Sequence, residues 1–165
     1  MANFYLDVIT RDARFSSTGR IDDVWLLEPV TRAAVAAIIA EAPMPLMVFE
    51  TFRSQARQAQ LFEQGATQLR RVGVHGYGLA CDIVKLVNGE PSWEGDFTFL
   101  GPLAKKHGLI WGGDWGQPQI SHGFRDMDHV QRITVADQAR LFTGTWYPDE
   151  AYSAYAATQR EGQTA

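Results

Sequence analysis

The sequence lacks the features that several classes of protein require. Cys81 is its single cysteine, which excludes a disulfide bond within the chain. The longest apolar stretch, at 33–40, is far too short to cross a bilayer. The first residues, MANFYLDVITRDARF, show no basic segment followed by an apolar one, so we expect no signal peptide. The net charge of -4 gives no electrostatic basis for binding nucleic acid or an anionic wall polymer.

The remaining composition is that of an ordinary globular domain. Its 165 residues are 45% hydrophobic and 21% charged, which argues against disorder and allows a core to be buried. We find no repeat, no low-complexity tract and no composition change that would mark a second domain. We therefore expect one domain over residues 1–165, with a C-terminal tail from about residue 146 whose polar end, from Gln159 on, is frayed.

Two segments, HGYGLACD at 75–82 and DMDH at 126–129, hold the residues best suited to chemistry. They supply His75, Asp82 and His129, and Asp126 stands three residues before the last histidine. Two neutral imidazoles and one carboxylate suit a catalytic zinc site, because three protein ligands leave the fourth tetrahedral position open for water. A further carboxylate can then act as the base that takes a proton from that water. The pattern indicates a metallohydrolase site.

Each of these residues also has a plainer interpretation. Gly76 and Gly78 mark a tight turn where backbone can approach a ligand closely, and Asp82 then enters an apolar strand, where an unpaired carboxylate is costly to bury. The alternative is that Asp82 pairs with the turn while His75 lies on the surface. Cys81 is interpreted as a small buried hydrophobe; a nucleophilic thiol is the alternative, although no base is marked for it.

At these residues the chain resembles the peptidoglycan metallopeptidases, which comprise D-alanyl-D-alanine dipeptidases and carboxypeptidases and phage L-alanyl-D-glutamate endopeptidases. HGYGLACD is similar to their (S)xHxxGxAxD signature, although Val74 stands near where many relatives carry a hydroxyl residue, and DMDH is similar to their (D/E)xxH signature. FRSQARQAQLFEQG at 52–65 and LIWGGDW at 109–115 resemble two further stretches, so the resemblance runs from about Glu50 to Gln131. The aspartate of DMDH and the WGGDW stretch favour the L-alanyl-D-glutamate branch.

The resemblance implies a hedgehog-type fold and a zinc peptidase that cuts the stem peptide of peptidoglycan, with the L-alanyl–D-glutamate bond favoured. It implies zinc on His75, Asp82 and His129, Asp126 as the base, and Arg53 as the group that stabilises the oxyanion. A D-alanyl-D-alanine carboxypeptidase or dipeptidase and a non-catalytic zinc-binding module are the alternatives.

The expected partner is the stem peptide rather than a nucleic acid or a membrane, and we expect a monomer. Together with the missing signal peptide, the resemblance implies a phage endolysin, a bacteriolytic enzyme. Such an enzyme stays in the host cytoplasm until a holin opens the membrane to the cell wall.

Neighbouring residues leave several roles open. Arg53 has the alternative of a surface arginine paired with Glu50 or Glu63, and we expect Arg57 to be solvated. Trp115 is an equal candidate for a wall of the substrate cleft and for the core, whereas Trp111 is assigned to the core. Asp114 and Asp128 are rivals of Asp126 for the role of base. His107 is expected at the end of a helix, where a cationic side chain is favourable to the helix dipole. His122 is expected to have no role, and it lies in a 116–125 loop that we expect to extend over the cleft.

The hydrophobic spacing predicts an α+β fold, a small antiparallel sheet flanked by helices with its strands neighbours in a meander. The expected helices begin at Pro29, with a buried stripe of Val30, Ala33, Ala34, Ala37 and Ile38 and an end at Pro43 and Pro45, and cover 55–64 between Ser54 and Gly65, 98–107 and 136–142. The expected strands cover 46–50, 80–87 before the Asn88-Gly89 turn, 109–111 and 129–133.

Overall fold

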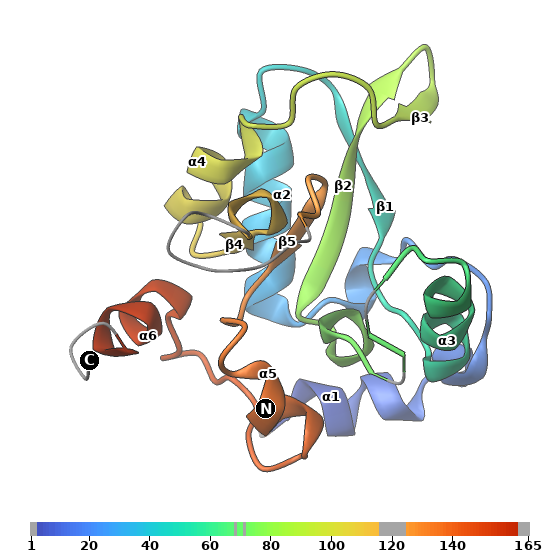
Figure 1. Ribbon diagram of the computed structural model, residues 1–165, viewed down its shortest axis with the longest axis vertical. Coiled ribbons are helices and arrows are strands. Elements are labelled where there is room, and N and C mark those ends of the chain that lie inside the picture. Colours follow the sequence, from blue (N-terminus) through green and yellow to red (C-terminus); the bar gives the residue numbers. More distant parts are fainter. Residues whose placement is uncertain (1–2, 68, 71, 116–124, 162–165) are drawn as a thin grey trace.

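A computed structural model describes residues 3–67, 69–70, 72–115 and 125–161 and confirms a small antiparallel sheet flanked by helices (Figure 1). The helices are α1 (Phe4–Asp7), α2 (Pro29–Glu41), α3 (Gln55–Glu63), α4 (Leu100–Lys106), α5 (Gln138–Phe142) and α6 (Ala154–Glu161). The strands are β1 (Leu46–Glu50), β2 (Ala80–Val87), β3 (Glu90–Ser92), β4 (Ile110–Trp111) and β5 (His129–Gln131). Short 3-10 turns occur at Ile9–Arg11, Ala13–Ser16, Val24–Leu26, Val74–Tyr77 and Gly112–Asp114.

The strand order places β2 at the centre of the sheet. The order is β1-β2-β5-β4, with β3 paired to the far end of β2, and every pairing is antiparallel. The expected meander is therefore wrong, because β5 lies between β2 and β4. This pairing sets Asp82 of β2 directly opposite His129 of β5.

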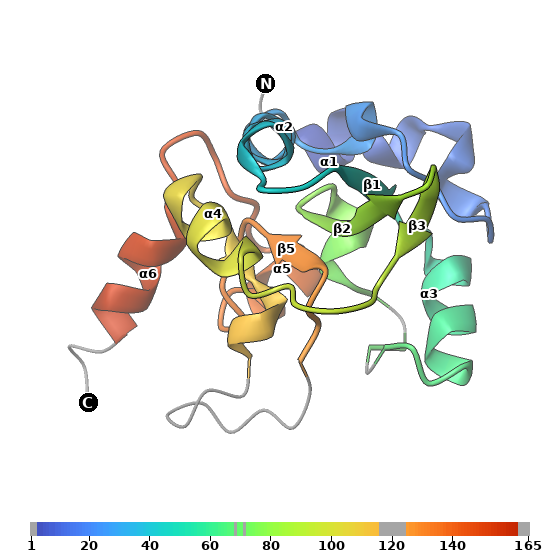
Figure 2. The same cartoon turned by 90° about the horizontal axis from the view of Figure 1, so that it is seen from above.

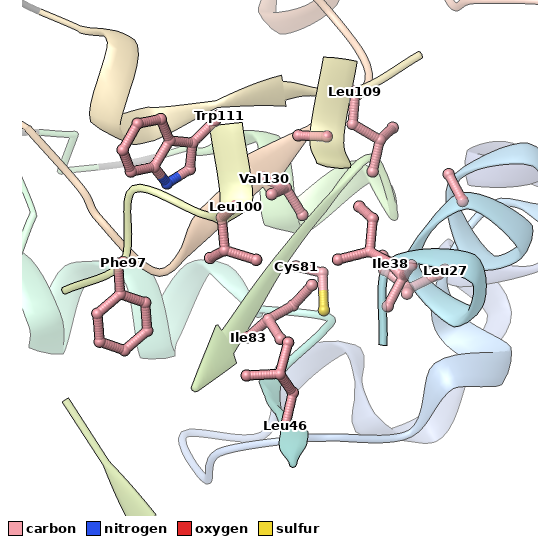
Figure 3. Packing of buried hydrophobic residues seen from close by; sticks show 13 residues of the cluster. Leu27, Ile38, Leu46, Cys81, Ile83, Phe97, Leu100, Leu109, Trp111 and Val130 are labelled. Carbon is pink, nitrogen blue, oxygen red and sulfur yellow. The ribbon is translucent and has the colours of Figure 1, made fainter. Parts of the chain in front are cut away.

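Helices α2 and α4 cover one face of the sheet (Figure 2). The core between them and the sheet includes Cys81 and Ile83, both fully buried (Figure 3). Because side chains alternate across a strand, Asp82 points away from this core, toward the opposite face. The functional side chains are therefore expected on the face that α2 and α4 leave uncovered.

Helix α2 begins at Pro29, as predicted, and ends two residues before Pro43. The Glu28 carboxylate caps it by accepting from the backbone N–H groups of Val30 (3.1 Å) and Thr31 (3.0 Å). The predicted stripe is partly wrong, because Val30 and Ala33 are exposed, while Thr31, Ala34, Val35 and Ile38 are buried. Thr31 can be buried despite its hydroxyl because that group donates to Glu28 at 2.9 Å.

Most other predicted elements are present, with changed ends. The strands at 46–50 and 80–87 match, and Ser54 caps α3 by accepting from the Arg57 backbone N–H at 3.0 Å. Asn88 (φ 53°) and Gly89 (φ 81°) form the predicted turn after β2. The turn leads into β3, a strand that the sequence did not predict. Helix α6 at Ala154–Glu161 was not predicted from the sequence. Within the described ranges, no helix combines the length and apolar character needed to cross a membrane.

Candidate active site

Three side chains that are far apart in the sequence converge at the start of β2. His75 comes from the 3-10 turn at Val74–Tyr77, Asp82 from β2 and His129 from the first residue of β5. His75 Nε2 lies 3.1 Å from Asp82 Oδ1 and 3.2 Å from His129 Nδ1, and His129 Nδ1 lies 3.1 Å from Asp82 Oδ1. All three residues are buried, and they form a group that can bind a metal ion.

The second ring nitrogen of His75 determines which tautomer faces the group. His75 Nδ1 lies 2.8 Å from the backbone carbonyl oxygen of Thr51, which can only accept a hydrogen bond. The proton is therefore on Nδ1, and Nε2 directs a lone pair toward Asp82 and His129. This is the arrangement of a histidine oriented to bind a metal.

A side chain that sequence reasoning missed orients the second histidine. His129 Nε2 lies 2.9 Å from Gln131 Oε1, and the Gln131 amide nitrogen donates to the carbonyl of Ile133 at 2.7 Å. The Ile133 carbonyl fixes the amide orientation, so Gln131 Oε1 accepts from His129 Nε2 and Nδ1 carries the lone pair. A period of two along β5, which puts residues 129 and 131 on one face, is the signal that would have found Gln131.

The three donor atoms fit a small divalent cation. Two imidazole lone pairs and a carboxylate oxygen meet with no proton between them. The three donor atoms therefore repel one another unless a cation lies among them. Zinc ligands at about 2.0–2.2 Å in a tetrahedron lie roughly 3.3–3.6 Å apart. The separations of 3.1–3.2 Å are close to that spacing.

Arg53 lies behind the group rather than on the surface. Its guanidinium contacts Glu50 Oε2 at 2.6 Å, Asp82 Oδ2 at 3.2 Å and, through Nη1, Gln58 Oε1 at 3.3 Å. The expected pairing with Glu50 is present, but only 11% of the Arg53 side chain is exposed. The expected solvation of Arg57 is wrong: its Nε lies 3.0 Å from Glu50 Oε1, because the buried Glu50 carboxylate attracts both arginines.

Asp126 lines a cavity beside the three ligands, and Asp128 lies behind it. Carboxylate oxygens of Asp82, Asp126 and Asp128 lie within 4.8 Å of one another. Burial raises the pKa of Asp128 to about 8; the Asp82 charge and a hydrogen bond with Asp126 add to the shift, and the Trp93 indole N–H opposes it. A cation at the three-ligand group would lower that pKa again. Asp114, the other rival for the base, is exposed and does not line the cavity.

The WGGDW stretch packs against the backbone of Asp126 and Met127. Trp111 is buried, as predicted, and its indole N–H donates to the Met127 carbonyl at 2.7 Å. A Cβ on Gly112 would lie 2.4 Å from the Asp126 carbonyl oxygen, and one on Gly113 would lie 2.1 Å from the Trp111 ring. The two glycines are therefore required for space, so that the backbone of Asp126 can pass close to this turn.

The cavity continues away from the three ligands between α3 and α5. Trp115 forms part of its wall, with its ring centroid 5.1 Å from that of His129, and its buried indole N–H has no hydrogen-bond partner among the described residues. Val74 also lies in the wall. Around the ligands and Asp126, the remaining lining residues are Arg53, Gln58, Thr67, Leu69, Gly73, Gln131, Val135 and Gln138.

Other candidates from the sequence are placed outside the cavity or cannot be placed. Cys81 is fully buried in the hydrophobic core, and this burial, with the charges of Asp82 and Asp128, raises the pKa of its thiol well above its ordinary value, which disfavours the thiolate that a nucleophile requires. His107 lies at the end of α4 and contacts Glu41 at 3.1 Å. Gly78 (φ 71°) approaches the Leu26 carbonyl rather than a ligand. His122 and all of the expected 116–125 loop except Arg125 lie outside the described residues.

Comparisons with known proteins agree with the resemblance seen in the motifs. A family model described as D-alanyl-D-alanine carboxypeptidase matches residues 67–132. The chain is 27% identical over 129 residues to CwlK of Bacillus subtilis (strain 168), named a peptidoglycan L-alanyl-D-glutamate endopeptidase, covering 65% of this chain and 74% of that protein.

Solved structures show the same fold. The L-Ala D-Glu endopeptidase ChiX of Serratia marcescens matches with a TM-score of 0.57 at 24% identity, over 74% of this chain and 95% of that chain. The LD-carboxypeptidase LdcB matches with a TM-score of 0.51 at 18% identity, over 72% of this chain and 64% of that chain. The expected α+β fold of this group is confirmed.

Proposed function

We propose that this chain, a member of the peptidoglycan peptidase family that its motifs resemble, is a zinc-dependent endopeptidase that cuts the L-alanyl–D-glutamate bond of the stem peptide. The observation that carries the proposal is the meeting of three lone pairs from His75, Asp82 and His129 beside a cavity that Asp126 also lines. A carboxylate at this point suits hydrolysis, because a module that only binds a metal has no use for a base.

The residues divide the chemistry between them. His75, Asp82 and His129 would hold the zinc ion, which would supply Lewis-acid chemistry for a peptide carbonyl and for water. Asp126 takes the proton from the attacking water and passes it to the leaving amine. Among the described residues, Arg53 directs four of its five N–H groups to Glu50, Asp82 and Gln58, which leaves one Nη1 donor for the oxyanion.

The charge of the cavity favours cleavage within the stem peptide. A carboxypeptidase must hold the terminal carboxylate of its substrate, for which a cationic side chain is the usual partner. Among the described lining residues Arg53 is the only lysine or arginine, and Glu50 and Asp82 already neutralise it. The names of CwlK and ChiX support the same choice of bond.

The biological setting is part of the proposal. The similarity of DMDH and WGGDW to the phage branch supports a bacteriolytic enzyme that reaches the wall from the host cytoplasm through a holin-type release. Such an enzyme, added from outside, should reduce the turbidity of cells whose walls are exposed.

Mass spectrometry of digested peptidoglycan tests the bond. We expect intact stem peptides with new N-terminal glutamate, and glycan strands that keep only L-alanine on their lactyl groups. The matched control is the His129→Ala protein, which should release nothing and should fail to retain zinc after dialysis. Release of free D-alanine alone would favour the carboxypeptidase alternative, and a zinc-loaded protein with no product on several wall types would favour the binding module.

A further inference from the structure

An indole that the mechanism does not use lies next to the carboxylates. Trp93 follows directly after β3, and 49% of its surface is exposed. Its Nε1–H donates to Asp128 Oδ2 at 2.7 Å, which places it one hydrogen bond from the Asp82, Asp126 and Asp128 cluster. Trp93 is therefore a neighbour of the reacting centre, although it does not line the cavity.

The ring of Trp93 is held in place while much of it stays open to solvent. Phe49 of β1 meets it edge to face, with ring centroids 4.7 Å apart and an interplanar angle of 83°. The Arg20 guanidinium lies 4.5 Å from the centroid of the Phe49 ring. An exposed tryptophan alone is unremarkable, but one fixed at both its N–H and its ring is preorganised for a ligand and loses little side-chain entropy on binding.

The chemistry around Trp93 defines the kind of ligand. The aromatic surface lies beside the cluster of Asp82, Asp126 and Asp128, which disfavours an anionic ligand, whereas a neutral ligand with hydroxyls can hydrogen-bond to the Asp128 carboxyl group. The apolar C–H face of a pyranose ring packs well on an indole, because both surfaces lose contact with water. A neutral sugar satisfies both conditions.

We propose that Trp93 is a stacking platform for the N-acetylmuramyl sugar that carries the stem peptide. The proposal rests on the proposed function, since cleavage after L-alanine leaves a single residue and a lactyl group between the scissile bond and the sugar. One residue spans at most about 3.6 Å, so the sugar must bind close to the metal group. Asp126 lines the cavity and belongs to the same carboxylate cluster as Asp128, which Trp93 contacts, so in this proposal the glutamyl side of the stem occupies the cavity and the sugar lies on Trp93.

Two substrates and two variants test the platform. One substrate is N-acetylmuramyl-L-alanyl-D-glutamyl peptide, and the other is the same peptide with an acetyl group in place of the muramyl unit. We expect the wild-type KM to be lower for the muramyl substrate by about tenfold. Trp93→Phe keeps a ring without the N–H donor and should retain most of this preference, whereas Trp93→Gln keeps an N–H donor without a ring and should abolish it.

Controls separate stacking from an indirect effect on Asp126. Trp25→Gln removes another exposed indole, 68% exposed and stacked on Arg32, and should change neither KM. The platform is refuted if Trp93→Gln impairs both substrates equally, which would mean that the indole acts through Asp128, or if Trp93→Phe loses the preference as fully as Trp93→Gln does.

A binding measurement distinguishes failure of this inference from failure of the proposed function. Calorimetry with N-acetylmuramyl-L-alanine should show binding to the wild-type protein that is about tenfold weaker in Trp93→Gln. If the wild-type protein cuts neither substrate, the choice of bond is wrong, and the calorimetry still decides whether the sugar binds Trp93. Equal binding to both proteins would overturn the platform whatever bond is cut.

Discussion

Gln131 accepts a hydrogen bond from His129, with 2.9 Å between Oε1 and Nε2, and both side chains lie on the same face of β5. The Gln131 amide is itself held by the Ile133 carbonyl at 2.7 Å. This short chain of contacts keeps the Nδ1 lone pair of His129 directed at Asp82 and His75.

We therefore expect Gln131→Leu to weaken zinc binding by about 10–100-fold, because the ring of His129 would lose the acceptor that selects its tautomer. Competition with a chromogenic zinc chelator would measure the affinity. Gln138→Leu is the matched control, since Gln138 lines the same cavity without a hydrogen bond to the three ligands among the described residues. Equal affinities for the two variants would show that Gln131 does not orient the ligand.

The Asp126→Asn protein should fold and bind zinc as the wild-type protein does, but its kcat should fall by at least about 100-fold, the usual contribution of general acid–base catalysis. The amide is nearly isosteric with the carboxylate but cannot take a proton from water. Zinc content and kcat would be measured on the same preparation. Asp114→Asn serves as the control, because Asp114 is exposed and should retain near-normal turnover. An active Asp126→Asn protein beside an inactive Asp128→Asn protein would move the role to Asp128.

Gly113→Ala should destabilise the fold by about 1–3 kcal/mol, because the added Cβ would lie 2.1 Å from the buried Trp111 ring and force it to move. Urea unfolding followed by fluorescence would measure the change. Gly19→Ala is the control: its Cβ would meet only the Ser17 hydroxyl at 3.4 Å, and the free energy of unfolding should change by less than about 0.5 kcal/mol. A stable Gly113→Ala protein would mean that Trp111 has room to shift.

Asp137 should make the stability of the protein depend on pH in the acid range. Burial alone would raise its pKa, but hydrogen bonds from Tyr152, Arg140 and Thr134 outweigh this and lower the pKa below the ordinary carboxyl value. A lowered folded-state pKa stabilises the fold above the unfolded-state pKa of about 3.9, and this stability is lost as the pH falls through the folded-state value.

Asp137→Asn should therefore be less stable than the wild-type protein at pH 7, by about 1–3 kcal/mol, and the difference should shrink as the pH falls below about 4. Urea unfolding at a series of pH values would follow it. Asp22→Asn removes an exposed carboxylate that pairs with Arg20 at 3.3 Å and should change stability by less than about 0.5 kcal/mol at pH 7. A difference for Asp137→Asn that stays constant down to pH 3 would exclude the linkage.

Local features of the sequence were sufficient to predict most elements and their chemistry. Pro29 and Ser54 begin helices where expected, and the apolar run at 80–87 forms the central strand, because caps, proline geometry and alternation act within a few residues. The motif segments also contain the histidine and aspartate side chains that meet in the structure.

The tertiary structure decided what depends on distant partners. Strand β5 lies between β2 and β4, whereas in a meander it would lie outside β4. Its pairing with β2 sets His129 opposite Asp82, which is 47 residues away in the sequence. Arg57 is drawn to the buried Glu50 instead of solvent, and the carbonyl of Thr51, which carries no side-chain signal, selects the tautomer of His75. Spacing along the chain determines which faces a strand or helix can present; only packing between distant segments determines which partners those faces meet.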